Sequence, residues 1–555
     1  MLGQYSDSDM VSHLLALKMV IDIRELESGP HCSGYIIKDG ILAFLNGCLS
    51  AQSDLPNMAH LLLGFSRIGE SLSISPNSQP GGGLPLLYAI VDLTQNYPDS
   101  ENGTFISWLI HIKSAALQVL RQLWVSQLSS TLVMVELRKC EFLSAQFANL
   151  TPVTVDGLWD GVPISSLAFW MGTSANGLAE FLNYRAFLYE YAATELRSVS
   201  FSRLTSIQKQ VLSILTGHSM NFDGLNQACV NLFDLFDFAD LDFGERREMP
   251  QVKYFVTVDI ETCLVRASDD SVAVYDLDAA RELLQLQAAQ SFGDGRTRSA
   301  TEEEQLHNEA IAVINYLDEA NRRNLVETAK RHAIHMWVEL VIATLQYSDM
   351  DYTSKVQFSL HALQIMTPKL ELMIVDEVED ALQLARLGDA LISTVATRSL
   401  DAEGRYGKLL IERLYHLFRA CIAGMHVLNS FPALREVLYG ICSRYLGFVI
   451  GKGSGARKAQ RNAMDCIRSA GVPLINVICD DAEGSVETCR LSALSLLGLF
   501  VNIARGEKSS FVVDTLVNMN MLEVLMEPLK YVADDFQRAE SNGEYLLQQI
   551  KTKAD

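Results

Sequence analysis

Several patterns that would indicate a secreted, membrane-bound or metal-binding protein are missing from this sequence. Its 555 residues include ten cysteines, but no Cys-x-x-Cys pair occurs, so free thiols are expected rather than a disulfide framework or a thiolate metal site. The polar N-terminus has no basic n-region and does not resemble a signal peptide. One long uncharged run, Gly161–Ala179, contains Pro163 and several serines, which favours a buried helix with its entry loop over a membrane span.

Basic residues are fewer than acidic residues in this chain. The chain carries 45 Lys and Arg against 67 Asp and Glu, a net charge of −22. Binding along a phosphate backbone needs the opposite sign, so direct contact with nucleic acid is not expected. An acidic surface instead suits polypeptide partners.

Proline is also scarce, with 13 residues in the chain and none between Pro250 and Pro368. Long stretches without proline favour successive helices. Apolar residues recur with helical period in eight segments: Ile106–Gln127, Leu178–Val199, Leu306–Leu317, Val326–Leu345, Leu370–Val395, Leu409–Val427, Val486–Ala504 and Val512–Leu529. The last two resemble an armadillo or HEAT unit, which buries its apolar face only by stacking on neighbours. The sequence therefore predicts an all-α fold, an irregular α-solenoid of HEAT/armadillo-like helix pairs.

Composition suggests three parts along the chain. Residues 1–250 and 301–555 are expected to form two stretches of solenoid, with armadillo/HEAT-like units in the second. Residues 251–300 form a connecting segment with a disordered loop and a small hairpin that pairs Lys253–Val258 with Ser271–Tyr275. Thr301 and Glu304 match a capping box at the start of the following helix.

Motifs for catalysis are incomplete. His332, His335 and Glu339 share a helical face, but neither a fourth metal ligand nor a His-Glu-x-x-His pattern accompanies them. The stretch from Gly447 to Gly453 has the wrong glycine spacing for a phosphate loop and lacks its Ser/Thr. We therefore predict no enzymatic activity, no cofactor and no metal. A metal-dependent enzyme using His332 and His335 remains the third alternative.

The basic residues around that glycine-rich stretch form a small patch. Lys452, Arg457, Lys458 and Arg461 follow one another closely, and they suggest either a solvated loop or a local site for an acidic partner.

Two features are candidates for partner binding. In the segment Asn221–Phe243, Phe233, Phe236 and Phe238 alternate with aspartates, so these rings either anchor a partner segment or form an ordinary core joint. Asn502 lies near a helix end in the armadillo-like unit. It either clamps the backbone of an extended peptide or caps its helix.

Five segments in order resemble the nucleoporin 192/205 family, the large inner-ring scaffold proteins of the nuclear pore complex. They are Pro56–Phe65 (PNMAHLLLGF), Phe181–Ser200 (FLNYRAFLYEYAATELRSVS), Asn221–Asp240 (NFDGLNQACVNLFDLFDFAD), Ala329–Val341 (AKRHAIHMWVELV) and Asp535–Leu547 (DFQRAESNGEYLL). The resemblance implies a helical scaffold at the nuclear envelope that accepts segments of linker nucleoporins. Through them it would position channel nucleoporins and support transport of protein and mRNA.

The resemblance covers a middle-to-C-terminal portion of longer proteins, so the chain is expected to be a fragment or a truncated product. Only two Phe-Gly dipeptides occur, Phe243-Gly244 and Phe292-Gly293, too few for the multivalent docking of a barrier nucleoporin. The second hypothesis is a soluble importin-like transport receptor, which shares the acidic charge and HEAT-like helices.

Overall fold

The computed structural model describes most of the chain. The described residues are 7–51, 55–69, 71–74, 84–97, 99–101, 103–220, 226–228, 231–266, 273–290, 299–396, 405–425, 431–451, 457–484, 486–503 and 511–518. Backbone contacts divide the chain into two compact units, Met1–Asp349 and Met350–Asp555.

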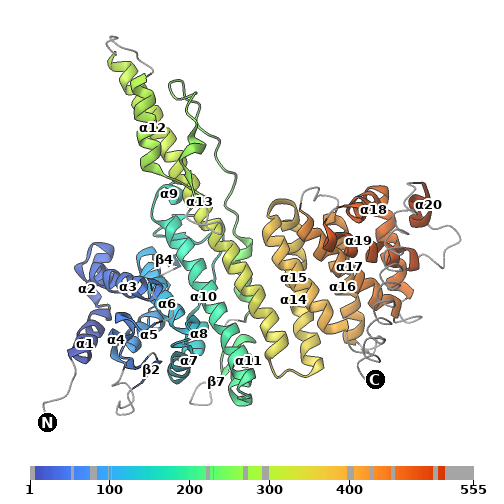
Figure 1. Cartoon of the computed structure of the whole chain (residues 1–555), viewed down its shortest axis with the longest axis horizontal. Helices are drawn as coiled ribbons and strands as arrows, with labels where there is room; N and C mark the ends of the chain where they lie inside the picture. Colours follow the sequence, from blue (N-terminus) through green and yellow to red (C-terminus); the bar gives the residue numbers. More distant parts are fainter. Residues whose placement is uncertain are drawn as a thin grey trace, which may run out of the picture. The chain divides into compact units, whose positions relative to one another are not determined.

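The first unit is built mainly from helices (Figure 1). They are α1 (Asp7–Met19), α2 (Ile23–Ser28), α3 (Ser33–Ala51), α4 (Met58–Leu62), α5 (Pro85–Gln95), α6 (Ser107–Val125), α7 (Ser130–Lys139), α8 (Phe142–Asn149), α9 (Leu167–Met171), α10 (Ser174–Phe201), α11 (Thr205–Leu215), α12 (Leu277–Gln290) and α13 (Ala300–Tyr347). Short 3₁₀ segments span Gly29–His31, Asp234–Asp240 and Ile260–Cys263.

The strands of this unit are two or three residues long and tie loops together. They are β1 (Ser66–Ile68), β2 (Ser71–Ser73), β3 (Ser100–Glu101), β4 (Thr104–Phe105), β5 (Leu158–Trp159), β6 (Val162–Pro163), β7 (His218–Met220), β8 (Asn226–Ala228), β9 (Leu264–Val265) and β10 (Val274–Tyr275). Strands β3 to β6 form one sheet in chain order, with β4 and β5 parallel, and the other strands form antiparallel pairs.

Helix α10 is the centre of the first unit, because it packs against α6 on one side and along α13 on another. Its apolar residues accordingly occur on several faces, and Phe181, Leu182 and Tyr191, which point in different directions around the helix, are all buried. A helix that is apolar around most of its circumference is stable only inside such a stack.

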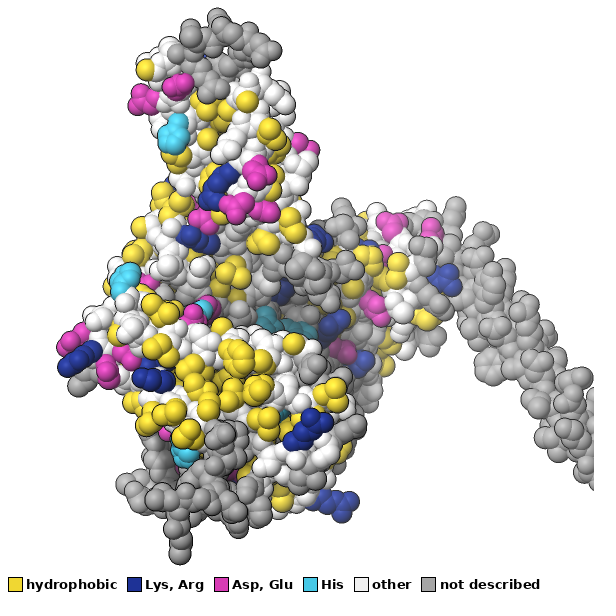
Figure 2. Space-filling model, turned by 60° about the vertical axis from the view of Figure 1, so that its left-hand side comes forward, with side chains coloured by type: hydrophobic (Ala, Val, Ile, Leu, Met, Phe, Trp, Pro, Cys, Tyr) yellow, Lys and Arg dark blue, Asp and Glu magenta, His cyan; other side chains and the backbone are white. Residues whose placement is uncertain are grey.

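The N-terminal helices of the unit bury one apolar stripe and expose another. In α3, Leu42, Leu45 and Leu49 are buried, whereas Ile36 and Phe44 are more than half exposed. Figure 2 shows hydrophobic side chains gathered over this part of the unit.

A buried ion pair joins α2 to α3. Lys38 Nζ lies 2.6 Å from Glu25 Oε2, and the Lys38 side chain is 2% exposed. The pair depends on Gly34, since a Cβ at this position would lie 2.0 Å from Glu25 Oε1. Any larger residue at position 34 must therefore move the carboxylate that neutralises Lys38.

The Gly34→Ala variant is expected to lose about 1–3 kcal/mol of unfolding free energy, because Lys38 then loses part of its buried partner. Gly40→Ala on the same helix is the control. Nothing lies within 4 Å of a Cβ there, so this change should stabilise α3 by up to about 1 kcal/mol. Urea denaturation compares the two. Equal effects of both substitutions would contradict the role of the ion pair.

His111 bridges two carboxylates on neighbouring helices. Its Nδ1 lies 2.6 Å from Glu180 Oε1 and its Nε2 lies 3.1 Å from Asp39 Oδ1. The hydrogen bond to Glu180 is the main cause that raises the pKa of His111 from 6.5 to about 9. The imidazolium therefore stabilises the folded state more than the unfolded state.

This raised pKa predicts a pH dependence. The stability that the charged His111 contributes is fully present below pH 6.5 and is lost as the pH rises through about 9. The difference in urea midpoint between the wild type and His111→Gln should therefore shrink over that interval. A difference that stays constant across it would contradict the assignment.

The second unit is a stack of helix pairs. Its helices are α14 (Tyr352–Asp376), α15 (Val378–Ala396), α16 (Arg405–Met425), α17 (Pro432–Gly451), α18 (Arg457–Glu483), α19 (Glu487–Ile503) and α20 (Phe511–Asn518). Helices α14, α16 and α18 pack side by side in one layer, and α15, α17 and α19 form the other. This is the stacking expected of a HEAT/armadillo-like solenoid, so the predicted fold class is confirmed.

Within the described residues, helix bounds differ clearly from the predicted ones in two places, and residues 519–529 of the last predicted helix lie outside them. The segments predicted at Leu306–Leu317 and Val326–Leu345 belong to one continuous helix, α13. Conversely, the segment predicted at Leu370–Val395 is broken at Glu377, whose φ of −129° and ψ of 65° end α14. No Gly or Pro marks this break, so periodicity alone did not indicate it.

The capping box lies two residues earlier than predicted. Ser299 Oγ accepts a hydrogen bond from the Glu302 N–H at 3.3 Å, and the Ser299 N–H donates to Glu302 Oε2 at 3.0 Å. The sequence Ser-Ala-Thr-Glu-Glu-Glu contains both registers of the motif.

The connecting segment contains a hairpin with a different first strand. Leu264–Val265 pairs with Val274–Tyr275, whereas the Lys253 and Tyr254 N–H groups donate to Glu309 Oε2 at 2.9 Å instead of forming a strand. The predicted loop after α12 lies largely outside the described residues. Helix α13 packs along α10 and belongs to the first compact unit.

Among the helices that the structure describes, none combines the length and hydropathy that crossing a bilayer requires.

Candidate docking groove

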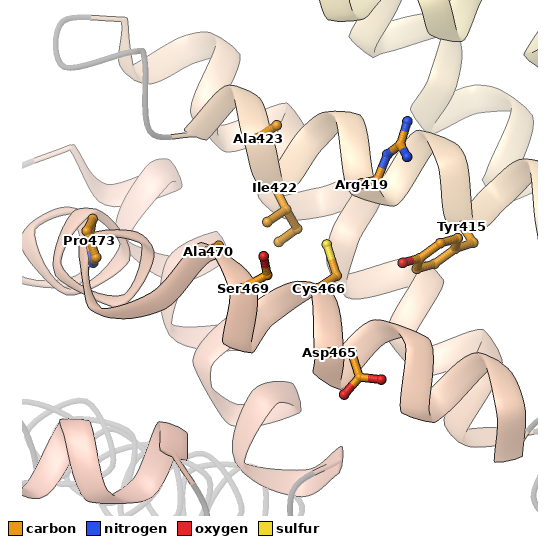
Figure 3. A pocket seen from close by; sticks show the side chains of 9 residues that line it. All are labelled: Tyr415, Arg419, Ile422, Ala423, Asp465, Cys466, Ser469, Ala470 and Pro473. Carbon is orange, nitrogen blue, oxygen red and sulfur yellow. The ribbon is translucent and has the colours of Figure 1, made fainter.

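A groove runs between α16 and α18 in the second unit. Its volume is about 650 Å³, and it is lined by Tyr415, Arg419, Ile422 and Ala423 of α16 and by Asp465, Cys466, Ser469, Ala470 and Pro473 of α18. In Figure 3, Ile422, Cys466 and Ser469 point into the space between the two helices. The groove therefore has an apolar floor with polar groups along its rim.

The sequence of α16 explains why it can both support the core and line the groove. Leu410, Leu414, Leu417 and Cys421 are fully buried at spacings of three or four residues. The groove residues repeat with the same spacing on a neighbouring face of the helix.

The far end of the groove is set by a kink in α18. Gly471 has φ 72° and ψ −160°, a conformation that favours glycine, and Pro473 follows it in the groove wall. Because the backbone turns here, the groove ends within the described part of α18.

Hydrogen bonds from α17 hold α18 in place. Arg435 Nε lies 2.6 Å from Asp481 Oδ2, and the Tyr439 hydroxyl donates to the same oxygen at 2.6 Å. Burial disfavours the charged carboxylate, but the hydrogen bonds from Arg435 and Tyr439 outweigh it and lower the pKa of Asp481. This bracing fixes the part of α18 that follows the kink at Gly471.

A smaller pocket of about 150 Å³ lies on the other side of α16, between α14 and α16, and shares Arg419 with the main groove. Arg419 Nη2 lies 3.4 Å from Glu371 Oε1 of α14. The layer α14–α16–α18 thus presents two adjoining depressions separated by one arginine.

The charge of this layer is opposite to that of the whole chain. Helix α16 contains four Lys or Arg residues and one acidic residue. Residues 457–470 of α18 also contain four Lys or Arg residues and one acidic residue, although the net charge of the chain is −22. Arg457, Lys458 and Arg461 of the predicted basic patch are exposed on the first turns of α18, whereas Lys452 lies outside the described residues. The stretches that flank the groove are therefore net basic, whereas the groove lining itself contains one basic residue, Arg419, and one acidic residue, Asp465.

The three phenylalanines proposed as docking residues lie in the core of the first unit. Phe233, Phe236 and Phe238 are at most 5% exposed, and the Phe236 ring stacks on Trp337 with centroids 4.0 Å apart. They offer no exposed surface in this structure, which agrees with the alternative interpretation as a core joint. Aromatic–aspartate alternation in the sequence does not separate these two roles.

Asn502 is exposed in the last turn of α19. Its groove-binding role stays a prediction. The groove residues of α16 and α18 did not stand out in the sequence, where their spacing is that of any amphipathic helix.

The His332, His335 and Glu339 face is occupied by contacts with α10. His332 Nδ1 lies 3.2 Å from Asn183 Oδ1, and Arg197 Nη2 lies 2.9 Å from Glu339 Oε2. Burial lowers the pKa of His332. The described residues contain no group of three or more His, Cys, Asp or Glu side chains placed to hold a metal ion.

Comparison with known proteins decides the family. A family model described as "Nuclear pore complex scaffold, nucleoporins 186/192/205" matches residues 1–554. The chain belongs to this Nup192 family. It is therefore a nuclear pore complex nucleoporin, as the ordered sequence segments indicated, and the prediction of a non-enzymatic scaffold agrees with the family description.

One curated relative is nucleoporin NUP192 of Chaetomium thermophilum. It is 30% identical to this chain over 537 residues, which covers 90% of this chain and 30% of that protein. The chain thus spans less than a third of the length of the Nup192 relative that it matches. Membership of a scaffold family favours the hypothesis of a scaffold nucleoporin over that of a soluble importin-like transport receptor.

Proposed function

We propose that this chain is a structural part of the nuclear pore inner ring and that its groove between α16 and α18 binds a segment of a linker nucleoporin. Through this contact it supports nucleocytoplasmic transport of protein and mRNA. The observation that carries the proposal is the apolar groove between α16 and α18 within a scaffold-family solenoid. Grooves between stacked helices accept amphipathic helices by burying their apolar side chains.

The properties of the groove define its occupant. Ile422 and Cys466 supply a neutral floor, since burial raises the pKa of the Cys466 thiol. The basic residues of α16 and of the first turns of α18 favour carboxylates beside the apolar stripe of the partner. The expected ligand is therefore a short helix with an apolar face and acidic flanks.

Charge reversal and steric obstruction in the groove test the proposal. The double variant Arg419→Glu/Ala423→Glu should recover about tenfold less of its partner nucleoporins in affinity capture from nuclear envelopes, because it removes a rim charge and places a carboxylate over the floor. Both positions are exposed, so the fold should persist.

Arg386→Glu is the matched control, because Arg386 is an exposed arginine of α15 in the opposite layer. It should capture the same partners as the wild type. Failure of the wild type to recover any other nucleoporin would contradict the scaffold function. Equal recovery by the groove variant and the control would place the binding surface elsewhere.

A further inference from the structure

Helix α12 and the first part of α13 form a hairpin with its own small core. Figure 1 shows α12 lying along the N-terminal part of α13. Leu284 of α12 and Val313 and Leu317 of α13 are buried together with Phe255 and Ile260 from the preceding segment. The hairpin is therefore supported on one side by this segment.

Next to this small core lies a groove of about 350 Å³. The lining residues are Phe255, then Arg281, Leu284, Gln285 and Ala288 of α12, and Leu306, His307, Ala310, Ile311, Ile314 and Asn315 of α13. The α12 residues follow the spacing of one helical face, and the α13 residues form a matching stripe. From Arg281 to Ala288 the groove extends over about two helical turns, roughly 11 Å.

The floor of the groove is apolar and incompletely covered. Leu306, Ala310 and Ile314 are only partly buried against the small core, and Ile311 is 44% exposed. Two antiparallel helices with such a stripe between them have the geometry that accepts a third helix.

The charges around this groove are almost all negative. Residues 277–290 and 300–321 contain eight acidic residues, and Arg281 is their only Lys or Arg. Arg281 Nη1 lies 2.5 Å from Asp278 Oδ1, so its charge is neutralised locally. Figure 2 shows hydrophobic and acidic side chains side by side on the face of the hairpin that it presents.

Several of these carboxylates have structural roles, and Asp318 and Glu319 form ion pairs with Arg322 and Arg323. Glu302 closes the capping box and Glu309 accepts the N–H groups of residues 253 and 254. Glu282, Glu303 and Glu304 are exposed. Glu303 precedes Leu306 and His307 by three and four positions, so it lies on the groove stripe of α13.

We propose that the α12–α13 groove binds a basic amphipathic helix of a partner protein. The apolar stripe of that helix covers Leu306, Ala310 and Ile314, and its Lys and Arg side chains face Glu282, Glu303 and Glu304. Since α16 and the first turns of α18 beside the other groove are net basic, the two grooves select different partners. Either assignment can hold without the other.

Two synthetic helical peptides of about 18 residues test the proposal with the whole chain, a length that spans the groove with turns to spare. Both carry the same leucine stripe, and one has Lys and Arg on its flanks where the other has Glu. In fluorescence anisotropy the basic peptide should bind at least about tenfold more tightly, and its affinity should fall with added salt. Equal binding of both peptides, or binding of neither, would overturn the assignment.

Variants locate the site. Glu303→Lys/Glu304→Lys should weaken binding of the basic peptide about tenfold, and Ile311→Gln should weaken it severalfold through lost apolar contact. Glu27→Lys/Asp156→Lys is the matched control, with the same change in net charge at two exposed acidic positions outside the hairpin. An unchanged urea midpoint shows that each variant is folded. Equal weakening by the control pair would show that net charge, and not this groove, attracts the peptide.

Discussion

Replacing Asp237 with alanine is expected to lower the unfolding free energy of the first unit by about 3–5 kcal/mol. Arg185 of α10 has a side chain with 0% exposure, and its Nη1 lies 2.5 Å from Asp237 Oδ1. Its other amino group donates to the Thr151 carbonyl at 2.5 Å. Without Asp237 the guanidinium keeps its charge in a buried site, where an unpaired charge is costly.

Urea denaturation of the whole chain measures this loss. Asp234→Ala is the control, because Asp234 is an exposed aspartate of the same 3₁₀ segment and should change stability by less than about 0.5 kcal/mol. The double variant Arg185→Met/Asp237→Ala should recover part of the loss, since it leaves no buried charge. If the double variant were less stable than Asp237→Ala alone, the unpaired charge would not be the cause.

Trp337→Ala is expected to have an effect of similar size, about 3–5 kcal/mol. Trp337 of α13 is fully buried, stacks on Phe236 with an interplanar angle of 18°, and donates a hydrogen bond from Nε1 to the Leu232 carbonyl at 2.9 Å. Removing the indole opens a large cavity between α13 and the 3₁₀ segment Asp234–Asp240. It also leaves the Leu232 carbonyl without its hydrogen-bond donor.

Trp337→Phe separates these two contributions. Phenylalanine keeps most of the ring contact but cannot donate, so we expect a smaller loss of about 1–3 kcal/mol. Phe201→Ala is the control, since Phe201 is 79% exposed at the end of α10 and should change stability by less than about 0.5 kcal/mol. A Phe variant as unstable as the Ala variant would mean that the hydrogen bond, rather than packing, dominates.

The sequence predicted most helices because their apolar stripes are long and regular. The helix expected at Ile106–Gln127 is α6, and that expected at Leu178–Val199 lies within α10. The break at Glu377 was missed because none of its neighbours is a helix-breaking residue. The capping box was misplaced because two overlapping registers have the same local chemistry.

Side-chain roles were less predictable than elements. Phe236 and Ala423 are both apolar residues of helical segments, yet Phe236 is buried under Trp337 whereas Ala423 is exposed and lines a groove. Periodicity shows that a residue faces something other than water. It does not show whether that neighbour belongs to the same chain.

The sequence by itself indicated the all-α class and, through five ordered segments, the scaffold family. Its catalytic motifs were incomplete, which led to the prediction of a non-enzymatic protein. Tertiary structure alone decided which stripes are core and which are grooves, because both grooves arise where two helices leave a gap. In the second unit these helices, α16 and α18, are separated in the chain by α17. Helix pairing also placed acidic residues beside the α12–α13 groove and basic residues beside the groove between α16 and α18. The electrostatic potential at each groove depends on the charges that lie near it in space, and not on the net charge of the chain.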